Sequence, residues 1–152
     1  MIEPVPTILV VEDNLTDVML IRRAFAKANL ENPLHVLGHG DAAVDYLAGR
    51  GEYADRAQFP LPALILLDLK LPRRSGLEVL DWLRGQEMLR RIPAVVLTSS
   101  SQSRDVDRAY DLGANSYLVK PVEFEELKEM LSKINVYWIH LNVKPTVNAA
   151  GQ

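Results

Sequence analysis

Apolar residues along this chain form two patterns: short uninterrupted runs, and longer stretches with an apolar residue at every third or fourth position. An uninterrupted run is typical of a strand buried on both faces, and the spaced pattern is typical of an amphipathic helix. The two patterns alternate along the chain, which predicts a parallel sheet with helices on both faces. The predicted strands are 7–11, 34–37, 63–67, 94–97 and 116–119.

Residues suited to helix ends support this division. Asn14 precedes the first helical stretch and can cap its N-terminus, and Gly113 follows the fourth and can end it. The polar segment 49–62 is long for a connection in an α/β unit and is interpreted as an insertion that contacts a partner. The predicted helices are 15–28, 41–48, 76–85, 103–112 and a last one from 123 onward.

The size and composition indicate one globular domain. The chain has 152 residues, of which 48% are hydrophobic and 24% charged. We expect a domain over 1–141, with the last helix extended, and a flexible tail over 142–152 that is rich in small and polar residues. A net charge of −3 and the absence of cysteine argue against nucleic-acid binding, disulfides and thiolate metal sites. No signal peptide or membrane-spanning run is found, so a cytoplasmic protein without membrane contact is expected.

Polar residues with chemical potential stand where the predicted strands end. Glu12 and Asp13 follow the first strand, Asp68 the third, Thr98 the fourth and Lys120 the fifth. The carboxyl ends of parallel strands share one edge of the sheet. With the strand order 2-1-3-4-5, strands one and three are neighbours at the topological switch point, where ligands bind in such folds. The sequence therefore predicts three carboxylates close together.

Such a cluster requires a cation, because like charges repel. Ligands that are all oxygen favour a hard ion such as Mg²⁺, and a lysine can meet phosphate as a point charge. A carboxylate nucleophile, Mg²⁺ and an ammonium suit phosphoryl transfer onto Asp68. Each residue alone has an ordinary explanation as a cap, a turn or a solvated charge. Their coincidence at four strand ends favours a site.

Four ordered motifs carry a resemblance to a known family. They are E-D-N at 12–14, D-L-K-L-P-R-R-S-G at 68–76, T-S at 98–99 and K-P at 120–121. Over 7–134 the chain resembles the response-regulator receiver domain of two-component signalling. The resemblance implies a flavodoxin-like (βα)5 fold with a doubly wound five-stranded parallel sheet.

The resemblance also implies roles for the acidic residues. Asp68 would accept a phosphoryl group from a sensor histidine kinase. Asp13 and Asp68 would bind Mg²⁺, together with the backbone carbonyl of Lys70, and Glu12 would act through water. Glutamate at position 12 stands where aspartate is frequent in the family, and the family accepts either. A regulator of this kind signals by protein contact and is not an enzyme.

The remaining motif residues would read out the phosphorylated state. By the resemblance, Lys120 contacts the phosphoryl group, Thr98 turns toward it and Tyr117 follows as the switch aromatic. The resemblance also implies a cis bond between Lys120 and Pro121. The loop 49–62 and the motifs at 99–105, 114–122 and 137–138 are similar to the small stand-alone regulators that partner bacterial and cyanobacterial phytochromes.

Three other classes of protein stay open at this point. A phosphohydrolase of the haloacid-dehalogenase type also has an aspartate nucleophile after a strand, but its second acid would stand at Lys70. A flavin or nucleotide module would share the fold, but the sequence has no G-x-G-x-x-G. A scaffold that is never phosphorylated would lack an acid or the lysine, and all are present.

The last helix suggests a homodimer. A continuous helix from Glu123 to Leu141 would be roughly 28 Å long at about 1.5 Å per residue, so its last turns are expected to project past the sheet. Tyr137, Trp138, Ile139 and Leu141 would then stand in water and form an apolar interface. The alternative is that the chain bends near Asn135 and folds these residues back over the domain.

Overall fold

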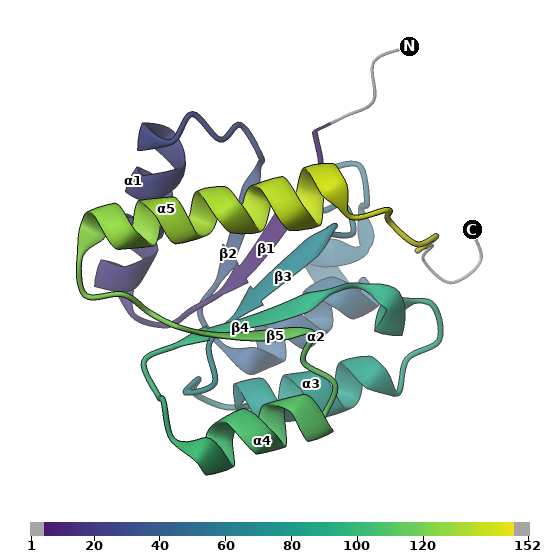
Figure 1. Ribbon diagram of the computed structural model, residues 1–152. Coiled ribbons are helices and arrows are strands. Elements are labelled where there is room, and N and C mark those ends of the chain that lie inside the picture. The colour runs from purple at the N-terminus through teal and green to yellow at the C-terminus, as the bar shows by residue number, and fades with distance from the viewer. Residues whose placement is uncertain (1–4, 148–152) are drawn as a thin grey trace.

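The computed structural model describes residues 5–147 and contains one five-stranded parallel sheet with the order β2-β1-β3-β4-β5 (Figure 1). This is the order predicted from the sequence, and the fold is the flavodoxin-like one. All strand pairs are parallel, so the carboxyl ends of the strands meet at one edge. The strands are β1 (Ile8–Val11), β2 (Leu34–Leu37), β3 (Leu64–Leu67), β4 (Ala94–Thr98) and β5 (Ser116–Val119).

Helices cover both faces of this sheet. Helices α1 (Leu15–Lys27) and α5 (Phe124–Ile134) pack together on one face, and α2 (Gly40–Ala48), α3 (Gly76–Arg84) and α4 (Ser103–Asp111) lie on the other (Figure 1). Successive side chains of a strand point to opposite faces. Accordingly Leu64 and Leu66 join the core beneath α1 and α5, whereas Ile65 and Leu67 join the core beneath α2 and α3. The uninterrupted apolar runs therefore mark strands buried on both sides.

Polar side chains fix the helix starts at the edge where the carboxyl ends meet. The side chain of Asn14 accepts a hydrogen bond of 3.0 Å from the backbone N–H of Asp17, as expected for a cap. Ser75 and Glu78 form a reciprocal capping box at the start of α3. These caps hold the chain just after β1 and after the β3 loop, so they also fix the backbone around Glu12, Asp13 and Asp68.

The segment 49–62 is packed onto the domain. It contains a 3-10 helix, η1 (Gly51–Ala54), and Arg56, whose guanidinium donates to the backbone oxygens of Tyr46, Leu47 and Phe59. The rings of Tyr46 and Phe59 meet edge to face, 5.9 Å apart. A second short 3-10 helix, η2 (Leu89–Arg91), precedes β4.

The last helix continues beyond Ile134 as a π-helix, η3 (Asn135–Leu141), without a sharp bend (Figure 1). In a π-helix the backbone bonds join residues five apart, and the N–H of Asn142 donates to Tyr137 over 2.7 Å. Ile139 belongs to the core beneath α1 and α5, together with Ile134, and is only 4% exposed. The expectation that Ile139 stands in water is wrong, because this end of the helix stays against the domain and does not project past it.

The chain after the π-helix lies against the amino-terminal edge of the sheet. Arg91 donates to the backbone oxygen of Thr146 over 3.1 Å, and Val147 packs against the core beneath α2 and α3. The predicted flexible tail, 142–152, falls partly outside the described residues, which end at 147. Within the described part of the chain, no helix combines the length and apolar character needed to cross a membrane.

Candidate functional site

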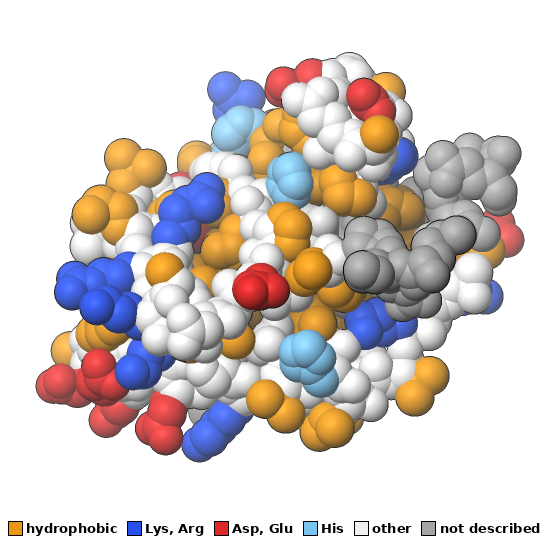
Figure 2. All heavy atoms as spheres, turned by 90° about the horizontal axis from the view of Figure 1, so that it is seen from above, with side chains coloured by type: hydrophobic (Ala, Val, Ile, Leu, Met, Phe, Trp, Pro, Cys, Tyr) orange, Lys and Arg blue, Asp and Glu red, His pale blue; other side chains and the backbone are white. Residues whose placement is uncertain are grey.

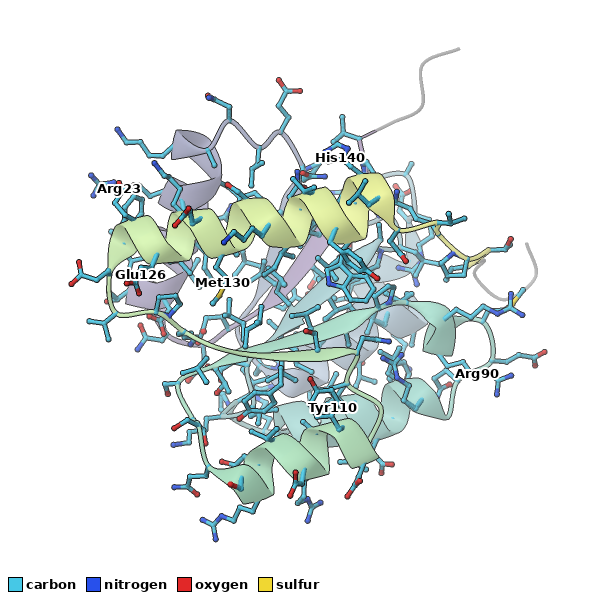
Figure 3. The ribbon with its side chains drawn as sticks, in the orientation of Figure 1. Arg23, Arg90, Tyr110, Glu126, Met130 and His140 are labelled. Atoms are coloured by element: carbon cyan, nitrogen blue, oxygen red, sulfur yellow. The ribbon has the colours of Figure 1, made fainter. Side chains whose placement is uncertain are left out.

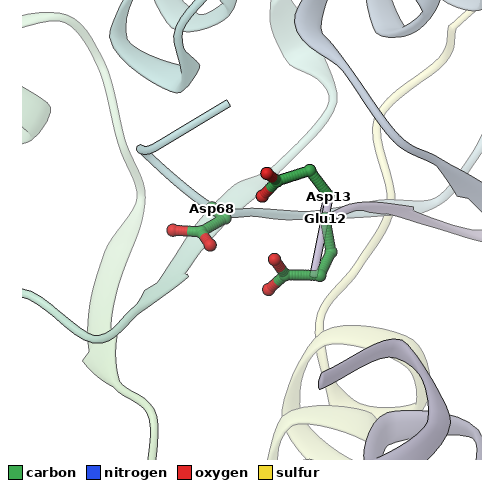
Figure 4. Close-up of side chains that lie close together, drawn as sticks. All are labelled: Glu12, Asp13 and Asp68. Atoms are coloured by element: carbon green, nitrogen blue, oxygen red, sulfur yellow. The ribbon is translucent and has the colours of Figure 1, made fainter. Parts of the chain in front are cut away.

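Three carboxylates meet at the carboxyl edge of the sheet, at the switch point between β1 and β3. Val11 is paired with Leu67, so the residues that follow them, Glu12 and Asp68, come side by side. One oxygen from each of Glu12, Asp13 and Asp68 lies within 4.8 Å of the others, and the three groups point into the same space (Figure 4). Glu12 and Asp68 are buried and Asp13 is exposed. The predicted convergence of the three acids is confirmed.

The two oxygens of Asp68 have different surroundings. Oδ1 accepts hydrogen bonds of 2.7 Å from the Thr98 hydroxyl and 2.7 Å from the backbone N–H of Leu69. Oδ2 accepts one bond, of 3.0 Å, from the ammonium of Lys120. Because Oδ1 is held by fixed donors, Oδ2 is the oxygen with a lone pair left for a reacting group or a metal.

Lys120, at the end of β5, forms ion pairs with three carboxylates near the ends of β1 and β3. Its backbone N–H donates to Thr98 over 2.8 Å, which fixes the start of the side chain beside β4. Its ammonium bonds to Glu12, to Asp17 over 2.8 Å and to Asp68 over 3.0 Å. Lys120, Glu12 and Asp68 were predicted from the sequence, whereas Asp17 was not. The one signal in the sequence was an acid in the first turn of a helix that begins beside the site, and such acids are common for reasons unrelated to function.

Burial and pairing set the charges of these groups. Burial raises the pKa of Glu12 to about 7, against the opposing effect of the bond from Lys120. Burial alone would also raise the pKa of Asp68, but the bonds from Thr98 and Lys120 outweigh it and hold that pKa below its ordinary value. Burial alone would lower the pKa of Lys120, yet its carboxylate partners raise it. At neutral pH Asp68 is therefore an anion and Lys120 a cation.

The proposed switch residues lie next to each other along the sheet edge. Tyr117, on β5, is paired with Val96 on β4, and Val96 precedes Thr98 by two residues. The Tyr117 hydroxyl donates to the backbone oxygen of Ser100 over 2.8 Å, in the loop that follows Thr98. The implied cis bond at Lys120–Pro121 is absent, because every peptide bond of the described residues is trans. A trans bond is the lower-energy form even before proline.

This sheet order, with acids, a threonine and a lysine at the carboxyl ends of its strands, defines a receiver of two-component signalling. The chain belongs to the response regulator receiver domain family, whose match covers residues 8–132. The resemblance inferred from the motifs is confirmed.

Similar proteins cover almost all of the chain. A probable methanogenesis regulatory protein, FilR2 of Methanothrix harundinacea, is 45% identical over 91% of this chain and 86% of its own length. The crystal structure of the phosphorylated cyanobacterial phytochrome response regulator RcpA has a TM-score of 0.86 and 35% identity, over 94% of this chain and all of that one. The Mn²⁺-bound form of response regulator Rcp1, a Synechocystis protein, has a TM-score of 0.82 and 37% identity, over 93% of this chain and 99% of that one.

Proposed function

We propose that this protein is a stand-alone response regulator that accepts a phosphoryl group on Asp68. The observation that carries the proposal is the surroundings of Asp68: a buried, ionised carboxylate with one oxygen fixed by Thr98 and the other facing Lys120. In the reaction a bond forms between Oδ2 and phosphorus, and the bond from phosphorus to the donor nitrogen or oxygen breaks. Lys120 would offset the charge of the incoming phosphoryl oxygens.

The acids fit a divalent metal, which we propose to be Mg²⁺. The cluster offers only oxygen ligands, and one relative has been solved with Mn²⁺ bound. Asp13 and Asp68 would hold the ion with the backbone carbonyl of Lys70, and Glu12 would act through water. A bound Mg²⁺ supplies positive charge that neutralises phosphoryl oxygens. Asp68 is then both a ligand and the nucleophile.

Thr98 and Tyr117 would convey phosphorylation to the surface. The Thr98 hydroxyl contacts Asp68, and Tyr117 contacts the loop after Thr98, so a change at Asp68 can reach β5 through two contacts. A hydroxyl that gains a bond to phosphoryl oxygen in one state only provides the differential contact that a switch needs. The signal would then be read by another protein at this surface.

The phosphoryl donor would be a sensor histidine kinase, and the similar proteins RcpA and Rcp1 suggest a phytochrome. We propose protein contact as the means of signalling, with no nucleic acid or membrane involved.

Phosphorylation by a small donor tests this function directly. The protein is incubated with acetyl phosphate and Mg²⁺, and the intact mass is followed with time. We expect one added phosphoryl group per chain and no gain without Mg²⁺. Continuous release of phosphate from a small phosphate ester would instead identify a phosphohydrolase, and no reaction with any donor would identify a scaffold.

We also propose that the protein is a homodimer and that the end of the last helix forms its interface. A groove of about 510 Å³ lies between β5 and the helix, with Leu118, Met130, Ile134, Tyr137 and Trp138 among its lining. Met130 projects from α5 on the side of β5, and apolar side chains lie among charged ones on the face over α1 and α5 (Figures 2 and 3). Tyr137 and Leu141 are exposed, and Trp138 is half-buried.

A second copy suits this surface because the surface carries both acidic and basic side chains, which can pair across a two-fold axis. Glu126, Glu129 and Lys133 border the groove, so the acids of one copy can face the lysine of another across a two-fold axis. The patch would then lose its contact with water, and one acid of each copy would pair with the lysine of the other.

Replacing Tyr137 and Leu141 with serine tests the dimer. Both residues stand at the surface, so the double variant should keep its melting temperature within a few degrees while losing interface area. In analytical ultracentrifugation at tens of micromolar, we expect the wild type to sediment as a dimer and the variant as a monomer. Met19→Ser, at an exposed position of α1, is the control and should stay dimeric. A wild type that is monomeric with and without phosphorylation would refute the dimer.

A further inference from the structure

The ammonium of Lys120 has three N–H bonds, and three different carboxylates accept from it. Two of them, Glu12 and Asp68, also belong to the cluster that can hold a metal. The third, Asp17, does not, although its contact of 2.8 Å is shorter than the 3.0 Å contact with Asp68. Of the three carboxylates that contact Lys120, Asp17 is therefore the one that is neither in the metal cluster nor the proposed phosphoryl acceptor.

The position of Asp17 is fixed by the helix start. Its backbone N–H donates to the Asn14 cap over 3.0 Å, so its carboxylate rises from the first turn of α1 beside the end of β5. The contact with Lys120 borders a cavity of about 30 Å³ whose remaining wall is mostly apolar, from Leu20, Ile21, Leu97 and Leu127. The Lys120 side chain is 13% exposed and that of Asp17 is 32% exposed. Water screens such a pair less than one on an open surface.

We propose that Asp17 is a positioning residue that keeps the ammonium of Lys120 aimed at Asp68 when a metal engages Glu12. This inference rests on the proposed phosphoryl transfer. The same ammonium contacts Asp17 and Oδ2 of Asp68 at once, so the Asp17 contact needs no rearrangement before Lys120 can meet a phosphoryl group on Oδ2. Once Glu12 turns to the metal, Asp17 is the partner that remains to hold the lysine in place.

Phosphorylation rates measure this role. With acetyl phosphate and saturating Mg²⁺, Asp17→Asn should react about threefold to fivefold more slowly than wild type, the range for a partly exposed ion pair. Asp17→Glu can still reach Lys120 and should recover most of the rate. Asp41→Asn is the matched control, because Asp41 is also a first-turn acid with a cationic partner, Arg74 at 3.1 Å, and it should leave the rate unchanged.

A double-mutant cycle shows whether Asp17 acts through Lys120. In a Lys120→Gln background, adding Asp17→Asn should change the rate by less than a factor of two. An equal slowing in both backgrounds, or no slowing in either, would overturn the proposal. A faster Asp17→Asn variant would overturn it as well, since it would show that Asp17 acts by repelling the anionic donor.

A second readout follows the lysine itself and not the reaction. In protein labelled with ¹³C at the lysine Cε, the Lys120 signal of wild type should stay apart from those of mobile lysines when Mg²⁺ is added. In Asp17→Asn it should move toward them on Mg²⁺ addition, and an unchanged signal would overturn the proposal. If wild type binds Mg²⁺ but takes no phosphoryl group, the proposed function fails and this measurement still decides the role of Asp17.

Discussion

Asp68→Asn should take up no phosphoryl group from acetyl phosphate or from a phosphorylated histidine kinase. The amide keeps the shape of the carboxylate, and its oxygen can still accept from Thr98 and Leu69, so the fold should be retained. What is lost is the anionic Oδ2 that faces Lys120. A neutral amide is a far weaker nucleophile than a carboxylate, so the loss should be complete within the detection limit of intact-mass measurement.

The matched control for this variant is Asp81→Asn, an exposed aspartate of α3, which should be phosphorylated like wild type. Circular dichroism and the melting temperature of Asp68→Asn would establish that the fold survives. Undiminished phosphorylation of Asp68→Asn would show that another group is the acceptor, and peptide mapping would identify it.

Asp13→Asn should bind Mg²⁺ roughly tenfold more weakly or worse, because a hard cation loses one of its charged oxygen ligands. The metal-free variant should be at least as stable as wild type, since the substitution removes a negative charge beside the ionised Asp68. Asp13 is exposed, so little packing is lost.

Thermal unfolding with increasing Mg²⁺ measures both effects, since a ligand that binds only the folded state raises the melting temperature with its concentration. Asp41→Asn again serves as the control and should show the wild-type dependence. If Asp13→Asn and wild type respond equally to Mg²⁺, Asp13 is not a ligand.

Most of the fold could be predicted because buried parallel strands appear in the sequence as uninterrupted apolar runs. The run from Leu64 to Leu67 is apolar on both faces, and that leaves a central parallel strand as the simplest interpretation. From the strand order, the meeting of Glu12, Asp13 and Asp68 follows by topology alone. Thr98 and Lys120 then join them because β4 and β5 are the next strands along the sheet.

Two features could not be predicted, because they depend on tertiary packing: the contact between Asp17 and Lys120, and the burial of Ile139. Asp17 lies on a helix, and only the path of the Lys120 side chain shows that the two meet. The exposure of Ile139 was predicted from the length of the helix, on the assumption that its last turns project past the sheet. Where a helix ends relative to the sheet depends on tertiary packing, and here Ile139 is buried in the core beneath α1 and α5.

The packing of the segment 49–62 bears on how this chain tolerates change. Its length and polar composition suggest a loop that proteases could cut or that an engineer could shorten, yet Arg56 ties it to the end of α2 through the oxygens of Tyr46 and Leu47. Phe59 packs beside the Tyr46 ring. Removing the segment would strip donors from a helix end and uncover an aromatic side chain that is now fully buried. Variation in length is therefore better accommodated at the exposed glycine turn before α2, Gly38, than here.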